Sequence, residues 1–293
     1  MKMPAVILLA LIIAVGAIWA QRRGRPGGGY GGGYGWRGRY NDGYRTPREI
    51  PQHSAPTPTW TNESGFDADT FTFVRIKRER GYGSGGDWST DTPDSDLNLS
   101  FRLQQITAMK VDPNGLFMRL TETNLSDYPF IYMVEPGSLF LSDEEAAALR
   151  KYLLNGGFLM LDDFWGERQW ANMEQELKKV FPERDFVELP LDHPLYHCVF
   201  DIKSKGQVPN VELGTASQYS GVTWEYHDGE QCKEVHHRAI YDDRGRMMVI
   251  ATHNTDNGDG WEWEGDNHYF FEHFSEKIAY PLTVNILFYQ MTH

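Results

Sequence analysis

The chain has 293 residues, of which 40% are hydrophobic and 24% charged, and its formal charge is −13. That length suits one large domain or two small ones, and the composition is ordinary for a globular protein. The charge is unevenly distributed. Residues 1–20 carry +1 through Lys2, residues 21–50 carry +5, and residues 51–293 carry −19. A body this acidic repels nucleic acid, so we expect no nucleic-acid partner, whereas cations and basic partners stay open.

Residues 1–20 predict a signal peptide or an N-terminal anchor. One lysine precedes an apolar run that ends in small residues, and cleavage after Ala17 or Ala20 fits this pattern. The alternative is an uncleaved anchor, because residues 4–20 reach the lower length limit for a membrane span. We therefore expect an exported protein, periplasmic or anchored facing outward, that meets the membrane only through residues 4–20. In an oxidising compartment Cys198 and Cys232 could pair.

Residues 21–65 predict a disordered spacer. A stretch rich in Gly, Tyr and Arg, "RRGRPGGGYGGGYGWRGRY", is followed by the proline-rich "PQHSAPTPTW". Neither stretch can bury enough apolar surface to offset the entropy of ordering the chain. Gly, Arg and aromatic residues are also typical of nucleic-acid-binding segments, but export would remove that ligand.

The ordered part should be a single domain over residues 66–293. Alternation in "TFTFVRIKR" predicts a first strand, and apolar residues at helical spacing then predict a helix capped by Asp94 or Ser95. The clearest helix begins where Ser142 and Glu145 form a capping box. The other expected elements are strands at 115–120, 129–134, 158–161 and 185–190, a helix at 167–181, a hairpin at 238–252 and a helix at 276–291 that begins or breaks near Pro281.

The alternation of strands and helices predicts a parallel sheet. The runs at 129–134 and 158–161 are apolar throughout, as strands covered on both faces are. The expected fold class is therefore α/β, a three-layer α/β/α sandwich with a mainly parallel sheet.

Asp162 and Asp163 stand where the strand at 158–161 ends, and Trp165 follows them in the turn. In open parallel sheets, ligands bind at the carboxyl ends of the strands. The two acids could be catalytic, metal-binding or turn-forming. Adjacent strand residues point to opposite faces, so both serve one site only if the strand has already ended. We expect Asp163 to face a cleft and Asp162 to hold the turn by accepting backbone N–H bonds.

Asp192 and His193 lie in "LPLDHPLYHC", a second candidate stretch. His193 and His197 are four residues apart, the spacing that places two metal ligands on one face of a helix. Pro194 weakens that interpretation because it pushes His193 toward an extended conformation. A turn stabilised by Asp192 and a ligand-facing His193 beside Asp163 both stay open.

A polar stretch, "THNTDNGDGWEWEGD", follows the hairpin and contains His253, Asn254, Asp256, Asp259, Trp261 and Glu262. Asp and Asn alternating with Gly suggest calcium, but the spacing is not that of the helix-loop-helix calcium site. We expect either a polar binding loop or a solvated loop. The sequence names neither a metal nor a cofactor.

Five stretches together resemble the bacterial family called domain of unknown function 4159: "DWSTDTPDSDLNL", "YPFIYM", "LRKYLLNGGFLMLDDFWG", "FPERDFVELPLDHPLYH" and "GDGWEWE". The resemblance implies a flavodoxin-like fold similar to class I glutamine amidotransferases, and the motif order is also similar to trehalose-utilisation-type domains. Catalytic amidotransferases carry a Cys at the strand-to-helix turn that here holds Asp162 and Asp163. Acyl transfer through a Cys thiolate is therefore not supported.

Two functions follow from these residues. The first is an exported binding or assembly domain with a degenerate amidotransferase-like site, which takes an unknown protein or small-molecule ligand. The alternative is a carboxylate and histidine hydrolase, with or without a metal ion, acting on a polar substrate such as a sugar. The missing nucleophile favours binding, whereas the convergence of Asp and His at strand ends favours hydrolysis.

Overall fold

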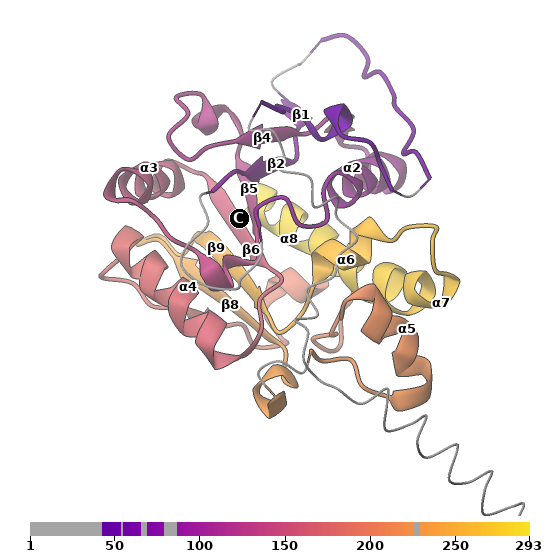
Figure 1. The fold of residues 1–293 in the computed structure, drawn as a ribbon. Coiled ribbons are helices and arrows are strands. Elements are labelled where there is room, and N and C mark those ends of the chain that lie inside the picture. The colour runs from indigo at the N-terminus through magenta and orange to yellow at the C-terminus, as the bar shows by residue number, and fades with distance from the viewer. Residues whose placement is uncertain (1–42, 54, 66–68, 79–86, 226–228) are drawn as a thin grey trace, which may run out of the picture. The chain divides into compact units, whose positions relative to one another are not determined.

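The computed structural model describes residues 43–53, 55–65, 69–78, 87–225 and 229–293, which all belong to one unit, Gly33–His293 (Figure 1). The predicted signal peptide or anchor at residues 1–20 lies outside the described residues, as does the glycine-rich half of the predicted spacer. No helix among the described residues combines the length and apolar character needed to cross a membrane.

A seven-stranded sheet forms the centre of this unit (Figure 1). Its strands, in spatial order, are β4 (Leu116–Met118), β2 (Val74–Ile76), β5 (Phe130–Val134), β6 (Phe158–Asp162), β9 (Met247–His253), β8 (His236–Tyr241) and β7 (Val187–Glu188). The strands from β4 to β9 are parallel, whereas β8 and β7 are antiparallel additions at one edge. The fold is therefore α/β with a mainly parallel sheet, as the sequence predicts.

Helices flank the sheet on both faces. They are α2 (Asp94–Ile106), α3 (Asp143–Leu154), α4 (Gly166–Val180), α5 (Val211–Ser220), α6 (Asn257–Glu262), α7 (His268–Phe270) and α8 (Tyr280–Thr292), with a π-helical segment Phe271–Ala279 between the last two. Short 3-10 turns lie at Pro47–Glu49, Leu125–Asp127, Pro136–Ser138, Pro194–His197 and Gly229–Cys232. The run predicted as one first strand is split, because β1 (Thr70–Phe71) pairs with β3 (Lys110–Val111) in a separate two-stranded sheet.

Helix starts follow local side-chain chemistry. The predicted capping box of α3 is present, with Ser142 accepting the Glu145 N–H and the Glu145 carboxylate accepting the Ser142 N–H. The cap predicted for α2 is wrong: its N-cap is Pro93. Asp94 does not cap, because its carboxylate instead accepts hydrogen bonds from Gln52 and from the backbone of His53.

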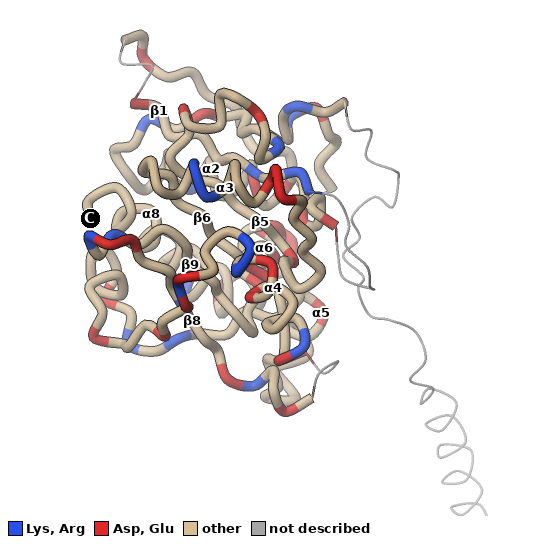
Figure 2. Tube along the Cα trace, turned by 90° about the vertical axis from the view of Figure 1, so that its left-hand side faces the viewer, with Lys and Arg blue, Asp and Glu red and all other residues tan. Residues whose placement is uncertain are grey.

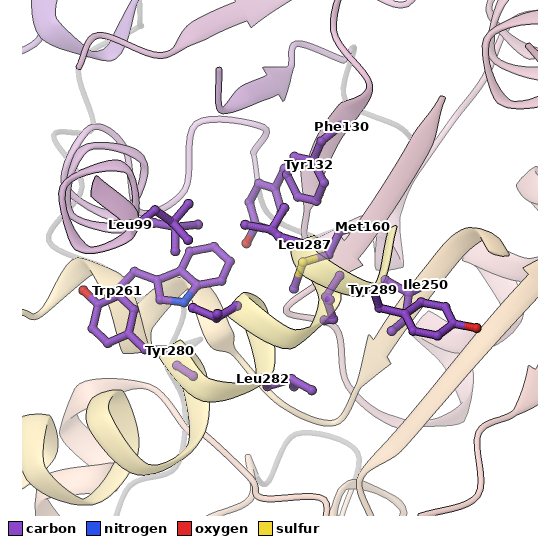
Figure 3. Close-up of a cluster of buried hydrophobic side chains, with 14 of the residues drawn as sticks. Leu99, Phe130, Tyr132, Met160, Ile250, Trp261, Tyr280, Leu282, Leu287 and Tyr289 are labelled. Carbon is purple, nitrogen blue, oxygen red and sulfur yellow. The ribbon is translucent and has the colours of Figure 1, made fainter. Parts of the chain in front are cut away.

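Two hydrophobic cores form because alternate residues of each central strand point to opposite faces. In β5, Phe130 and Tyr132 join the core that packs against α8 and Trp261 (Figure 3), whereas Ile131 and Met133 join the core under α3 and α4. Each fully buried side chain of this size contributes roughly 1.5–3 kcal/mol by leaving water. Coverage of both faces explains why the strand sequences are apolar throughout.

The second half of the predicted spacer packs against the domain. Arg48 donates to the carbonyl oxygens of Pro113 (2.9 Å) and Thr57 (2.6 Å), and the Trp60 indole donates to that of Val111 (2.8 Å). The boundary predicted at residue 66 is therefore too late. Specific bonds from polar side chains to backbone carbonyls hold this segment, and such bonds leave no apolar periodicity in a sequence.

Candidate metal centre

Five carboxylates meet beyond the carboxyl ends of β6 and β9. Asp163 follows β6, Asp256 caps α6, Asp259 and Glu262 lie within α6, and Asp91 comes from the turn before α2. Their oxygens form two groups, Asp91–Asp163–Asp256 and Asp91–Asp259–Glu262, within each of which the atoms lie within 4.8 Å of one another. Figure 2 shows acidic positions gathered around α6 and β5. Asp91 belongs to both groups.

Backbone conformation directs several of these side chains. Asp91, Asp163, Glu135 and Asn254 have φ values of 64°, 57°, 49° and 62°, in the left-handed region that only glycine adopts freely. Glu135, Asp163 and Asn254 directly follow β5, β6 and β9. Each such residue costs on the order of 1–3 kcal/mol, and such residues tend to cluster at functional sites.

The site contains carboxylate oxygens without a hydrogen-bond donor. Asp91 is 4% exposed and Glu262 is 1% exposed, yet Asp91 Oδ2 and Glu262 Oε2 have no partner among the described residues. Gly258 leaves the space in front of Asp91 Oδ2 open, because a Cβ at position 258 would collide with that oxygen. Leaving a buried polar atom unpaired normally costs about 1–3 kcal/mol, so these atoms point to a missing ligand.

Burial makes the negative charge of the cluster unfavourable. It raises the pKa of Asp91, Asp163, Asp256 and Asp259 well above the usual aspartate range, and neighbouring carboxylates raise each pKa further. Burial likewise raises the pKa of Glu135 to about 7. Buried carboxylates of this number stay ionised only when cations compensate them, and otherwise take up protons.

Two basic side chains border the cluster. His53 Nε2 lies 2.8 Å from Glu262 Oε1 and 3.6 Å from Asp94 Oδ2, and the hydrogen bond to Glu262 raises the His53 pKa. Arg75 is fully buried, pairs with Asp96 at 2.6 Å and donates to the carbonyls of Trp88 (3.2 Å) and Thr90 (2.9 Å). Arg75 thereby holds the turn that carries Asp91, but its charge is already matched by Asp96.

Asp162 has a different environment from Asp163. Its two oxygens accept bonds from Thr252 Oγ1 (2.5 Å), Asn257 Nδ2 (2.8 Å), the Gly258 N–H (3.0 Å) and Tyr132 Oη (3.2 Å). Asp162 therefore ties β5, β9 and the start of α6 to the end of β6.

Among the described residues Asp163 accepts one hydrogen bond, from the Trp165 indole N–H, which lies 3.0 Å from its Oδ1. Trp165 is itself buried at the N-cap of α4, so it fixes the orientation of the Asp163 carboxylate. The other carboxylate oxygen is left to the cluster.

The expected proximity of Asp163 to His193 is wrong. His193 Nε2 lies 3.2 Å from the Tyr241 hydroxyl, and Tyr241 pairs with Met247 at the start of β9. His193 therefore lies at the amino end of the parallel strands, because β8 runs antiparallel to β9. Asp192 is exposed beside it. Neither residue belongs to the carboxylate cluster.

His253 also points away from the cluster. Its ring packs on Phe164 (4.9 Å between centroids) and Trp170 (5.3 Å), on the face that α4 covers. Its Nε2 bonds the Gly166 carbonyl (3.1 Å), and its Nδ1 lies 3.3 Å from Arg238 Nη1. Because Arg is always a donor, Nδ1 must be the acceptor, and burial lowers the His253 pKa to about 3.

Asn254 contacts backbone groups, and Trp261 packs among core side chains. Asn254 accepts the Gly166 N–H (2.8 Å) and donates to the carbonyls of Gln231 (2.8 Å) and Glu234 (2.7 Å). Trp261 is fully buried in the core of Figure 3, 5.5 Å from the Tyr132 ring. Of the ten residues predicted for the site, three remain in the cluster: Asp163, Asp256 and Asp259.

Sequence reasoning assigned no site role to Asp91, Glu135 and His53, and it indicated Glu262 only as part of the polar stretch after the hairpin. Asp91 and Glu262 stand in the motifs "DWSTDTPDSDLNL" and "GDGWEWE". The sequence shows both motifs, but it does not show that the two carboxylates lie close together in the fold. Glu135 directly follows a buried strand, the same signal that identified Asp163. His53 carried no signal, because its segment looks like a spacer.

Fold and site define an α/β protein with a mainly parallel sheet whose carboxyl edge carries an enclosed set of carboxylates. The chain belongs to the family described as domain of unknown function (DUF4159), whose model matches residues 72–291. That range includes all five carboxylates of the cluster but not His53. A search of curated proteins found no match.

Proposed function

We propose that this domain binds a divalent cation through Asp91, Asp163, Asp256, Asp259 and Glu262. The observation that carries the proposal is Asp91 Oδ2, a buried and unpartnered oxygen of the residue that both carboxylate groups share. Carboxylate-only sites suit hard cations such as Ca²⁺, Mg²⁺ and Mn²⁺. We expect Ca²⁺ to bind in preference to Mg²⁺, because enclosed carboxylates leave little room for the water ligands that Mg²⁺ retains.

Binding is favoured over catalysis by the lack of a nucleophile in the turn after β6. Asp163 stands at the position where the resemblance to amidotransferases places a Cys. The two cysteines are free thiols elsewhere: Cys198 contacts the Asn285 carbonyl of α8, and Cys232 lies in the turn before β8. We further propose that residues 1–20 export the domain, so that it meets extracytoplasmic cations.

Calorimetric titration of chelator-treated full-length protein with Ca²⁺ tests the proposal. The wild type should bind Ca²⁺ and release protons, because protonated carboxylates must ionise. Asp91→Asn and Gly258→Ala should each weaken binding at least about tenfold, the first by removing a shared ligand and the second by filling the space beside it. Asp192→Asn, an equal charge change at an exposed acid, is the matched control. Equal affinities for Asp91→Asn and Asp192→Asn would refute the site.

Metal-assisted hydrolysis of a polar substrate is the second candidate, favoured by Glu135. Its Oε2 accepts a bond from Thr90 (2.9 Å), and a carboxyl with a pKa of about 7 suits general acid–base catalysis. A shared Asp91 is also compatible with two bridged ions. A screen of p-nitrophenyl glycosides and esters with Ca²⁺ or Mn²⁺ decides it: turnover that Glu135→Gln abolishes while cation binding persists establishes hydrolysis, and no turnover leaves binding alone.

A further inference from the structure

A second set of charged residues lines a cavity on the other side of β9. The cavity, of about 840 Å³, lies between β7, the start of β8 and the segment around Lys205. Its size falls within the usual range of small-molecule sites. Because His236 pairs with His253, the cavity flanks the same edge of the sheet as the carboxylate cluster.

Three basic side chains converge on one carboxylate in this cavity. Glu188 accepts a hydrogen bond from Lys205 Nζ and forms an ion pair with Arg238 (2.9 Å from its Nε), and His236 Nδ1 lies 3.2 Å from it. Lys233 and Glu234 also line the cavity, but Lys233 is paired with Glu230. Around Glu188 itself two cations, Lys205 and Arg238, face one carboxylate, and that pair of cations attracts anions.

Arg238 is held in place before any ligand arrives. Its guanidinium carbon lies 4.1 Å from the centre of the Trp170 ring, and its Nη1 is bonded to His253. The neutral state of His253 is what allows its Nδ1 to accept that bond. In the part of the chain that the structure describes, Arg238 Nη2 has no hydrogen-bond partner, so one donor stays available to a ligand.

We propose that this cavity binds a small organic anion, whose carboxylate or phosphate takes the place of the Glu188 carboxylate between Lys205 and Arg238. Glu188 can move away because its side chain is 42% exposed and β7 is a two-residue edge strand. Lys205 and Arg238 are only 15% and 19% exposed, so they stay in place. Ser204 and Thr223 line the same cavity. The Thr223 hydroxyl already donates to Gln207 Oε1 (2.8 Å), so it can accept from the rest of the ligand, whereas Ser204 can donate.

This anion site is independent of the cation site. Gln207 separates them, because it lines the cavity while its amide donates to the carbonyls of Asn254 and Cys232, both at 2.8 Å. Protein freed of divalent cations should therefore still bind the anion. Failure to bind the anion would not count against the cation site, and failure to bind a cation would not count against the anion site.

Calorimetric titration of cation-free full-length protein tests the proposal with three probes: glucose 6-phosphate, glucuronate and uncharged glucose. Binding of either anion in preference to glucose is expected, and the stronger of the two shows whether phosphate or carboxylate is the preferred oxyanion. Lys205→Ala should weaken anion binding about tenfold. Glu188→Gln should strengthen it about threefold or more, because it removes the competing charge.

Lys203→Ala is the matched control, since Lys203 is 74% exposed and lies outside the cavity. Arg238→Gln provides a second loss-of-binding variant if it folds, and the Lys205 and Glu188 variants decide the question if it does not. Equal weakening by Lys203→Ala and Lys205→Ala would overturn the proposal. So would weaker binding by Glu188→Gln, or equal affinity for glucose and the anions.

Discussion

Adjacent aspartates take opposite roles when one faces donors and the other faces acceptors. Asp162 is surrounded by four donors, including Thr252 and the Gly258 N–H, whereas Asp163 has one donor and faces other carboxylates. Their placement at the end of β6 could be predicted from the apolar run before them. Which donors meet Asp162 could not, because Thr252 and Gly258 lie 90 or more residues away in sequence.

Substitution of these two residues should separate stability from binding. Asp163→Asn removes one of several mutually repelling carboxylates and keeps an oxygen for the Trp165 indole. We expect the free energy of unfolding without cation to stay the same or rise slightly, while Ca²⁺ binding is lost. Urea unfolding with and without Ca²⁺ measures both effects.

Asp162→Ala should have the reverse effect. It leaves the buried donors of Asn257, Tyr132 and the Gly258 N–H without their acceptor, so the free energy of unfolding should fall by about 3 kcal/mol. The same urea series measures it. If Asp163→Asn is the strongly destabilising variant and Asp162→Ala is neutral, the roles are reversed.

At the scale of elements, the direction of each strand determines at which edge of the sheet its flanking residues lie, and the sequence does not give that direction. The β8–β9 hairpin was predictable from its turn residues, yet its antiparallel direction carries His193 and Tyr241 to the opposite edge from Asp163. Strand alternation predicts which face of the sheet the His253 ring occupies, but only if His253 is known to belong to β9. Strand ends alone therefore predict a site that includes His193 and His253, and the strand pairing of the structure places both outside the carboxylate cluster.

The segment before residue 66 should contribute to stability, contrary to its spacer-like sequence. Arg48→Ala removes bonds to three backbone carbonyls, so the free energy of unfolding should fall by about 2 kcal/mol. Arg168→Ala, at an exposed position of α4, is the control and should change it by less than about 0.5 kcal/mol. Equal melting temperatures for both variants would mean that the segment does not pack in solution.

At the scale of the whole molecule, the enclosed carboxylates should make stability depend on pH and on cation together. Their pKa values are raised in the folded state, so the folded state binds more protons than the unfolded state. Without cation, stability is therefore greatest while the carboxyl groups are protonated. It falls as the pH rises above about 4, and for Glu135 it continues to fall through a pH of about 7.

Buried histidines oppose this trend only in acid. Burial lowers the pKa of His237 and His253 to about 3, so each costs stability as pH falls from about 6.5 toward 3. Above pH 7 both histidines are neutral in either state and no longer affect the slope, whereas the raised pKa of His53 acts in the same direction as the carboxylates. Urea unfolding at pH 7, 8 and 9 should show stability falling with pH in chelator and staying level in excess Ca²⁺. Parallel slopes in both solutions would argue against cation binding at the cluster.

Anomalous X-ray diffraction from crystals soaked in Mn²⁺ tests the central claim most directly, because it locates the ion itself. Mn²⁺ favours the same oxygen ligands as Ca²⁺ and Mg²⁺. We predict an anomalous peak within bonding distance of Asp91 Oδ2 and of oxygens from Asp163 and Asp256 or from Asp259 and Glu262, and no such peak in Asp91→Asn crystals. A wild-type crystal with Mn²⁺ bound elsewhere and no peak at Asp91 would contradict the account.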